Sequence, residues 1–382
     1  MRIIVASDSY KGSSSTMQVA DAVEKGIKKV FSQAEVVKIP VADGGEGTVD
    51  ALVTGTGGVY KEVEVVGPLG ERLKASYGVL NNKVAVIEMA AASGLPLVPQ
   101  NKRNPLVTTT YGTGQLIKAA LDEGCKKIFI GIGGSATNDA GLGMAQALGV
   151  KFTDKDGNSL GYGGGELARL AHIDISNLDA RLKDSEIIVA CDVSNPLCGE
   201  KGASAVYGPQ KGATPEMVKQ LDENLGHFAD IVQHQLGQDV AGIPGTGAAG
   251  GLGAGLIVFC GASLRSGIET VLDLIGIDQY LQGADLVITG EGRIDGQSIY
   301  GKVPVGISKR AGKYNVPVLA IVGGMGEGAS AVYEYGIGSI MSIVNGPMAL
   351  EIAMKKSEEL LEDTAERAMR IVKIGMNIKR HD

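Results

Sequence analysis

Short apolar runs alternate along the chain with segments in which hydrophobic residues recur every three or four positions. Residues 2–6 form the first apolar run, and residues 17–31 follow with Val19, Val23 and Ile27 on one stripe. Such a run predicts a buried strand, and such a stripe predicts an amphipathic helix. Because this pair repeats, the pattern predicts βαβ units and a mainly parallel sheet. Further strands are predicted at 35–41, 127–132, 187–191, 285–289, 317–322 and 339–344, and further helices at 115–123, 142–148 and 350–374.

A different pattern occupies the region from about residue 61 to residue 87. Apolar and polar residues alternate there across turns at 67–70 and 81–82, which is typical of antiparallel hairpins. Another hairpin turn is predicted at 154–158. We therefore expect an α/β domain with a parallel sheet, formed by residues 1–60 and 285–382, and a mixed α/β domain, residues 61–284, inserted into it. A length of 382 residues also favours two domains over one.

The chain contains 57 glycines, and many of them gather with Asp, Asn, Ser or Thr directly after the apolar runs. In an open α/β sheet, the loops that follow the strands lie together at the edge where ligands bind. Glycine lets backbone N–H groups approach a phosphate closely in such loops. The sequence therefore favours an enzyme that handles phosphate groups. The loops concerned are residues 8–13, 43–48, 131–139 and 290–295.

Charge and composition argue against several classes of protein. A formal net charge of -7 disfavours nucleic acid as the main partner, because such binding requires a basic surface. The four cysteines are scattered and form no CxxC pair, which disfavours a structural zinc site or a disulfide framework. Neither a signal peptide nor a membrane-spanning stretch is recognisable. We therefore expect a cytoplasmic protein that binds neither nucleic acid nor membrane.

The loop at 131–139 is the strongest candidate for a phosphate site. Backbone amides and the positive end of the following helix would favour an anion there. The alternative is a tight turn in which Asn138 or Asp139 only caps the helix. The candidate ATP- and phosphate-binding residues are Gly133, Gly134, Ser135, Thr137, Asn138 and Asp139.

The loops at 8–13 and 43–48 follow neighbouring predicted strands and should lie side by side on the same edge of the sheet. Lys11 in the first of them could neutralise a carboxylate or a phosphate, or it could simply be solvated. Each loop taken alone could equally be an ordinary turn. The candidate substrate-binding residues in these two loops are Asp8, Ser9, Asp43, Gly44 and Gly45.

Two aspartates and an arginine at predicted strand ends fit the needs of phosphoryl transfer. That reaction uses magnesium bound by one or two carboxylates, and often a carboxylate that accepts a proton. Asp192 or Asp295 could fill either role, or each could cap a turn. Arg293 could clamp a carboxylate or stabilise the transferring phosphoryl group, or it could pair with Asp295. Three further cations lie beside Gly or Pro turns, and we expect each to be solvated and not functional: Lys211, Arg103 and Lys302.

Two other site classes find little support. The Walker A motif is missing from the sequence, and the one Gly-x-Gly-x-x-Gly match, residues 245–250, does not follow a convincing strand. Close packing of its small residues is the interpretation we favour over a dinucleotide site. The histidines lie outside the glycine loops and suggest no hydrolase triad; they are His172, His227, His234 and His381.

Ten segments of the chain resemble the bacterial type-1 glycerate kinases. The resemblance runs from residue 1 to about residue 375, with small departures at Tyr10 and Ser14, where the family often has Phe and an apolar residue. The similar segments are residues 8–13, 41–48, 67–70, 88–95, 104–109, 131–139, 190–193, 207–213, 247–251 and 289–295.

This resemblance implies a flavodoxin-like or Rossmann-like sheet domain that carries the insertion, with the active site in the cleft between the two domains. It implies a kinase that uses ATP and Mg²⁺ to phosphorylate D-glycerate, usually to 2-phosphoglycerate, although some members are catalogued as 3-kinases. We then expect Lys11 or Arg293 to bind the glycerate carboxylate, and ATP phosphates to lie over the 131–139 loop. Asp192 or Asp295 would hold the metal. The expected catalytic residues are Asp192, Asp295, Lys11 and Arg293.

Other functions stay open on the sequence. A nicotinamide-dependent hydroxy-acid oxidoreductase would use residues 245–250, and a sensor would bind a small acid without turnover. The expected partners are D-glycerate and ATP, with a homodimer left open. The sequence does not decide which hydroxyl is phosphorylated, which nucleotide is preferred, or how Asp8, Asp43, Asp192 and Asp295 divide the roles of base and metal ligand.

Overall fold

The computed structural model describes residues 1–378 and divides into two compact units. Unit 1 comprises Met1–Asp43 and Ile268–Asp382, and unit 2 comprises Gly44–Gly267. An insertion between the two ends of a parallel α/β unit is therefore present, but its boundaries differ from the predicted 60/61 and 284/285. The segment 44–60 belongs to unit 2 because its helix packs on that unit's sheet: a Cβ at Gly78 would lie 2.6 Å from the side chain of Val53.

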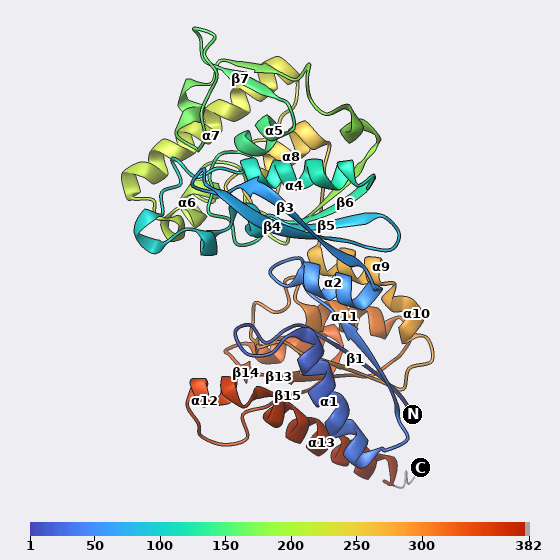
Figure 1. The fold of residues 1–382 in the computed structure, drawn as a ribbon. Helices are drawn as coiled ribbons and strands as arrows, with labels where there is room; N and C mark the ends of the chain where they lie inside the picture. Colours follow the sequence, from blue (N-terminus) through green and yellow to red (C-terminus); the bar gives the residue numbers. More distant parts are fainter. Residues whose placement is uncertain (379–382) are drawn as a thin grey trace. The chain divides into compact units, whose positions relative to one another are not determined.

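Unit 1 is built on a parallel five-stranded sheet with the order β15-β13-β11-β1-β2. Figure 1 shows its helices on both sides of this sheet. The order matches a flavodoxin-like arrangement, in which the chain changes direction between β1 and its neighbour β11. The elements are β1 Arg2–Ser7, α1 Thr16–Val30, β2 Glu35–Pro40, α9 Gly267–Ile275, α10 Ile277–Leu281, β11 Leu286–Thr289, β12 Arg293–Ile294, α11 Val303–Gly312, β13 Val318–Val322, β14 Gly324–Met325, β15 Ile337–Ser342, α12 Leu350–Lys355 and α13 Ser357–Met376.

The helices α1 and α13 pack together on one face of this sheet. Ile3 and Val5 of β1 are buried in one cluster with side chains from both helices, as the alternation of a strand predicts. The backbones approach so closely that a Cβ on Gly26 would collide with the carbonyl oxygen of Glu362. The prediction of a single helix at 350–374 is wrong, because two helices, α12 and α13, occupy this region. The chain breaks at Lys356, next to the buried hydroxyl pair formed by Ser357 and Ser14, whose oxygens are 2.6 Å apart.

A cluster of four charged residues joins α9, α10 and α11 in unit 1. The guanidinium of Arg310, with 9% of its side chain exposed, contacts carboxylates of all three partners. Its distances are 2.7 Å to Glu269, 2.5 Å to Asp273 and 2.6 Å to Asp278. Because one buried cation pairs with three acidic groups, α9 and α10 are both held against α11.

Unit 2 contains a mixed six-stranded sheet with the order β10-β9-β6-β5-β4-β3. The pairs β3–β4 and β4–β5 are antiparallel, as the alternation at 61–87 predicts, and the remaining pairs are parallel. The elements are α2 Thr48–Thr56, β3 Val59–Val66, β4 Arg72–Val79, β5 Val84–Glu88, α3 Ala90–Ser93, α4 Tyr111–Asp122, β6 Lys127–Gly131, α5 Leu142–Ala147, β7 Lys151–Thr153, β8 His172–Asp174, β9 Glu186–Ala190, α6 Ala203–Tyr207, α7 Pro215–Leu236, α8 Leu252–Cys260 and β10 Ser263–Arg265.

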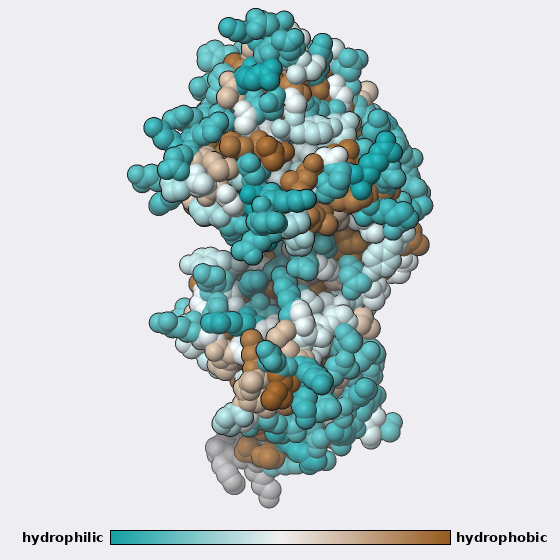
Figure 2. Space-filling model, turned by 60° about the vertical axis from the view of Figure 1, so that its left-hand side comes forward, coloured by the Kyte–Doolittle hydropathy of each residue, from teal (hydrophilic) through white to brown (hydrophobic). Residues whose placement is uncertain are grey.

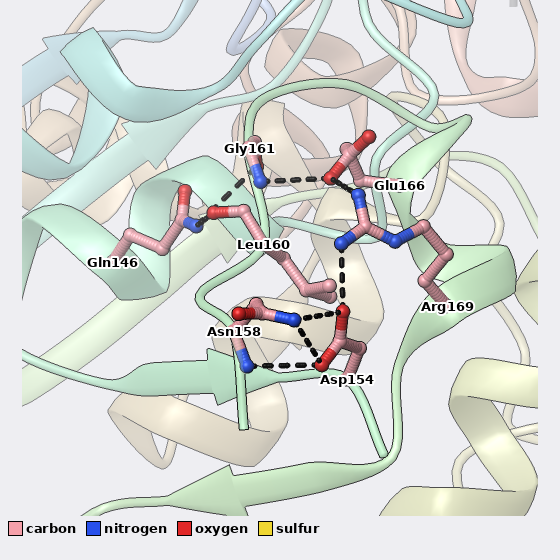
Figure 3. A network of polar contacts seen from close by, with 7 residues as sticks. All are labelled: Gln146, Asp154, Asn158, Leu160, Gly161, Glu166 and Arg169. Atoms are coloured by element: carbon pink, nitrogen blue, oxygen red, sulfur yellow. Dashed lines mark hydrogen bonds and ion pairs between the residues drawn. The ribbon is translucent and has the colours of Figure 1, made fainter. Parts of the chain in front are cut away.

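The predicted turn at 154–158 is present and is closed by a polar network (Figure 3). The carboxylate of Asp154 accepts hydrogen bonds from the backbone of Asn158 at 2.9 Å and from Arg169 at 2.8 Å. Arg169 also contacts Glu166, which in turn accepts from Gly161 N at 2.8 Å. These hydrogen bonds, that from Arg169 above all, hold the pKa of Asp154 well below its usual range. Beyond the turn, the regular partner of β7 is β8.

No helix within residues 1–378 combines the length and the apolar character needed to cross a bilayer.

Candidate functional site

The carboxyl ends of β1, β2 and β11 bring three acidic residues together in unit 1. Asp8 follows β1, Asp43 lies shortly after β2, and Glu291 follows β11. The hydroxyl of Ser7 and the amide of Asp8 both donate to the carbonyl of Gly290 at 2.9 Å, which fixes the loops after β1 and β11 to each other. Ligands bind at such a switch point in open α/β sheets.

Glycine at position 290 is required by this arrangement. A Cβ there would collide with the carbonyl oxygen of Ile321 on the neighbouring strand β13. The chain can therefore leave β11 close to β13 and turn so that Glu291 lies beside Asp8 and Asp43.

A cavity of about 810 Å³ opens at this edge and is lined only by residues of unit 1. Four of the residues predicted for the site, Asp8, Ser9, Lys11 and Arg293, contribute to its lining. Asp43 and Asp295 do not, although Asp43 lies against the lining residue Lys302, with 3.2 Å between its carboxylate and Nζ. The polar side chains that line the cavity include Asp8, Ser9, Lys11, Glu291, Arg293 and Lys302.

Burial makes two of these carboxyl groups unusually weak acids. Burial and the nearby charge of Asp43 raise the pKa of Asp8 from 3.8 to about 6, against the opposing effect of the Ser9 amide. Burial, with Asp8 and Asp43 as further causes, raises the pKa of Glu291 from 4.5 to about 7. Burial works against the charge of Lys302, but Asp43 and Glu291 raise its pKa overall. The edge thus offers carboxyl groups that can exchange protons near neutral pH.

The loop after Glu291 places Arg293 both beside Asp295 and at the cavity. Its guanidinium is 70% exposed and lies 3.5 Å from the carboxylate of Asp295, so the ion pair exists. Arg293 also lines the cavity. Asp295 accepts from the amide of Gln297 at 3.0 Å, which is the arrangement of a turn cap. The side chain of Ser298 connects the loop back to Glu291, to which it donates at 2.9 Å.

In unit 2, the predicted loop at 131–139 presents only two residues to solvent. Gly133 and Gly134 are exposed, and Gly134 has a φ of +73°, a conformation that favours glycine. Ser135, Thr137, Asn138 and Asp139 are all buried. The helix that follows, α5, has only six residues.

Asp139 holds the loop and the start of α4 together. Its carboxylate accepts from the backbone and hydroxyl of Thr110, both at 2.9 Å, and from the amides of Gly141 and Gly143 at 3.2 and 3.3 Å. Burial raises its pKa despite these hydrogen bonds. Asp139 thus connects this loop to the start of α4, whereas the N-cap of α5 is Gly141, which has no side-chain cap hydrogen bond.

Lys211 lies beneath the same loop and is not solvated, contrary to our expectation. It is 1% exposed, and its Nζ donates to Ser135 Oγ at 2.8 Å and to the carbonyl of Thr137 at 2.7 Å. Burial lowers the pKa of Lys211 from 10.5 to about 7, with Asp139 acting in the opposite direction. Two polar atoms of the 131–139 loop, Thr137 Oγ1 and Asn138 Nδ2, are buried without a hydrogen-bond partner among the described residues.

The other predicted residues of unit 2 lie around the carboxyl end of β9. Asp192 follows β9, and its carboxylate oxygens both accept from Gly267 N at 3.2 Å. Gly44 has a φ of +91°, and a Cβ there would lie 2.6 Å from that of Ala190. The carbonyl of Gly45 accepts from Thr48 Oγ1 at 2.7 Å. Glycine at position 44 is therefore required by the path of the chain itself.

The Gly-x-Gly-x-x-Gly segment packs closely, as favoured from the sequence. A Cβ at Gly247 or at Gly250 would collide with the carbonyl oxygens of Pro196 and Thr137, respectively. The strand required before a dinucleotide-binding loop is lacking here, because the segment follows a run of turns. Its glycines are explained by contacts within unit 2.

No group of three or more His, Cys, Asp or Glu side chains within residues 1–378 is arranged to hold a metal ion. Magnesium bound next to phosphates commonly needs only one or two carboxylates, with water and phosphate oxygens completing its shell. Asp192 and Asp295 belong to different units. Each can offer oxygen ligands of the kind that magnesium prefers.

A profile of the glycerate kinase family matches residues 3–373. The chain belongs to the glycerate kinase family. This family member is 54% identical over 364 residues to the glycerate kinase of Halalkalibacterium halodurans, covering 95% of this chain and 96% of that protein. It is 50% identical to the glycerate 2-kinase of Escherichia coli, covering 98% of this chain and 99% of that one.

A crystal structure from Salmonella typhimurium LT2, of a protein provisionally named glycerate kinase 2, has the same fold. Its TM-score with this glycerate kinase family member is 0.91 at 50% identity, covering 99% of this chain and 100% of that chain. The predicted fold class, a flavodoxin-like parallel sheet unit with an inserted mixed α/β unit, is confirmed by this match and by the sheet orders.

Sequence reasoning missed three residues of interest in this glycerate kinase family member. Glu291 lies in the loop after a predicted strand, separated from it by Gly290, so the rule that was applied to Asp8 would also have selected it. Lys302 and Lys211 were treated as solvated cations beside turns, although one lines the cavity and the other is buried. The sequence near them contains no signal of burial, because the groups that surround them come from distant segments.

Proposed function

We propose that this protein catalyses phosphorylation of D-glycerate by ATP, giving 2-phosphoglycerate and ADP. The observation that carries the proposal is the match to the glycerate kinase family across almost the whole chain. The identity of 50% to the glycerate 2-kinase of Escherichia coli supports the 2-position over the 3-position. The cavity of unit 1 adds suitable chemistry, because it combines weakly acidic carboxyl groups with the cations of Lys11, Arg293 and Lys302.

Within this proposal, the polar part of the cavity binds the reacting hydroxy acid. Lys11 or Arg293 pairs with the carboxylate of glycerate, since either cation can neutralise it and Arg293 can do so with two hydrogen bonds. The glycerate hydroxyl oxygen bonds to the γ-phosphorus as the bond from that phosphorus to the bridging oxygen of ADP breaks. Glu291 accepts the hydroxyl proton, because a carboxylate with a pKa near 7 is matched to that task at neutral pH.

The proposed phosphate contacts are backbone amides of unit 2, and the proposed metal contacts are two aspartates. In the 131–139 loop, the exposed amides of Gly133 and Gly134 remain our candidates for phosphate contact, whereas Ser135, Thr137, Asn138 and Asp139 would act only by holding the loop. Magnesium, when bound, neutralises charge on the phosphates. We propose Asp192 and Asp295 as residues that would hold it.

The direct test of the function is incubation of the protein with MgATP and D-glycerate, followed by phosphorus NMR of the product. A new resonance coupled to the proton on carbon 2 is expected, with ADP formed in equal amount. A signal coupled to the carbon 3 protons would instead assign a 3-kinase. Glycerate binding without release of ADP would indicate a sensor, and tight NADH binding without ATP turnover would indicate an oxidoreductase; either result would overturn the proposal.

The roles of the two aspartates are tested by Asp192→Asn and Asp295→Asn. If they hold metal, each change should lower turnover by orders of magnitude. Asp156→Asn at the exposed tip of the 154–158 turn is the matched control and should retain wild-type turnover. Near-native turnover in both variants would mean that other residues hold the ion.

A cytoplasmic location and the homodimer stay predictions. Cell fractionation and light scattering of the purified protein would test them.

A further inference from the structure

The cavity in unit 1 has two chemically different ends. One end carries the charged groups already described. The other end is apolar and is formed by β14, the loop after β15 and α12. Its lining side chains include Met325, Ile343, Val344, Met348, Leu350 and Met354.

Several of these apolar side chains are open to solvent. Leu350 is 75% exposed, Met325 is 51% exposed and Val344 is 38% exposed. Figure 2 shows hydrophobic residues gathered on a surface of unit 1, next to polar ones. An apolar surface that continues from a charged pocket is a common sign of a ligand site.

Glycerate cannot account for this end of the cavity. It has three carbons that carry a carboxylate and two hydroxyls, so it gains nothing from methionine and leucine side chains. A ligand that spans both ends must join a neutral, flat, largely apolar group to a strongly anionic one. Of the two substrates in the proposed reaction, ATP has that construction.

We infer that the adenine base of ATP lies against this apolar surface, with its phosphates directed towards the end that contains Lys11, Arg293 and Lys302. The inference rests on the proposed function and adds the position of the nucleotide. Methionine suits such a surface, because its flexible thioether packs well on aromatic rings and adapts to their shape. Lys302, together with whichever of Lys11 and Arg293 does not hold the glycerate carboxylate, provides the positive charge needed by the phosphates.

The two ends of the cavity are held in fixed relation by direct contacts. The hydroxyl of Ser13, in the loop that contains Lys11, donates to the carbonyl of Met354 at 2.9 Å. A Cβ built on Gly12 would lie 3.1 Å from the Met354 methyl group, so the loop lies directly against α12. The loop that contains Lys11 and the helix α12 therefore contact each other directly beside the cavity that both line.

The test compares three substitutions with asparagine, which removes apolar surface without adding charge. Leu350→Asn and Val344→Asn change exposed lining residues, so the fold should be retained. Ile352→Asn is the matched control, because Ile352 is 49% exposed on the same helix but does not line the cavity. Calorimetry would measure binding of ADP and of inorganic tripolyphosphate to each full-length variant, with circular dichroism to verify folding.

We expect the dissociation constant of ADP to rise about tenfold in each lining variant, the scale set by loss of one large apolar contact. It should not change in Ile352→Asn, and binding of tripolyphosphate should not change in any of the three. Unaltered ADP binding in both lining variants, or equal weakening of ADP and tripolyphosphate, would overturn the inference. Failure of the proposed function looks different: ADP would bind with this pattern, but no phosphate would reach glycerate.

Discussion

Replacing Glu291 by glutamine should make unit 1 more stable at alkaline pH while it impairs catalysis. Glu291 is 5% exposed, and its carboxylate lies near Asp8 and Asp43, with Lys302 as the opposing cation. Glutamine keeps the shape and can still accept the hydrogen bond from Ser298. The substitution therefore removes the ionisation of the side chain and little else.

The magnitude follows from the raised pKa. The folded protein holds the Glu291 proton up to a pH of about 7, whereas an unfolded chain releases it near 4.5. The raised pKa therefore leaves the free energy of unfolding unchanged below pH 4.5, lowers it progressively between pH 4.5 and 7, and lowers it by the full amount above pH 7. At one pKa unit per 1.36 kcal/mol, that full cost is roughly 3 kcal/mol, as an upper limit.

Hydrogen exchange of the β11 amides would measure this effect, because slow exchange there reports the opening free energy of unit 1. At pH 8.5 we expect Glu291→Gln to open less readily than wild type by up to roughly 3 kcal/mol, and at pH 5 we expect little difference. Glu327→Gln, at an exposed carboxylate of the same unit, is the control. A variant less stable than wild type at pH 8.5 would refute the reasoning, because it would mean that the ionised carboxylate is favoured by its surroundings.

The same variant tests the proposed proton acceptor. Loss of general base catalysis should lower kcat by about 10²- to 10⁴-fold. Wild-type kcat/KM should rise with pH to a plateau, with a midpoint near 7, as Glu291 loses its proton. Full activity of Glu291→Gln would assign the proton to another group, such as Asp8.

Three further predictions concern stability. Gly26→Ala should destabilise unit 1 by about 2–4 kcal/mol in urea unfolding, because the new methyl group meets the backbone of α13. Arg310→Met should cost about 2 kcal/mol in the same assay, since it leaves three carboxylates facing one another without a cation. Between pH 7 and 10 the folded wild-type protein binds fewer protons at Lys211 than the unfolded chain does, so its melting temperature should rise with pH. This rise should be smaller in Lys211→Met, which has no group that titrates at this position.

Each of these has a control or a contrary outcome. Gly312→Ala, on an exposed helix position with nothing within 4 Å of the added Cβ, should not destabilise the protein. Equal effects at positions 26 and 312 would mean that helix propensity, and not the contact with α13, decides the result. A stable Arg310→Met variant would show that its exposed partners are already well solvated. An unchanged pH slope in Lys211→Met would show that Lys211 stays protonated throughout this range.

Much of the fold follows from local patterns. Several strands begin and end within two residues of the predicted limits, among them β1, β2, β6, β9, β11 and β13. Parallel strands that are buried on both faces consist of short, nearly continuous runs of apolar residues, which can be recognised in the sequence. The long C-terminal helix was only partly predicted. Its hydrophobic periodicity continues through Lys356, and the break there coincides with the pairing of Ser357 with Ser14, a residue more than 340 positions away.

The candidate site, like the fold, could be predicted only in part. The gathering of Asp8, Lys11 and Arg293 at one edge could be predicted, because parallel strands place their carboxyl ends together. The burial of Lys211 could not be predicted, because no local pattern shows which segments will cover a lysine.

The sequence by itself determined the order of strands and helices, the class of the fold and the family, since these depend on periodicity and on motifs that are contiguous along the chain. Only the tertiary structure decided the limits of the two units, the pKa of Glu291, the structural role of Asp139 and the apolar end of the cavity. The physical reason is that burial and electrostatic environment are produced by segments that meet in space. A linear pattern does not contain the distances between them.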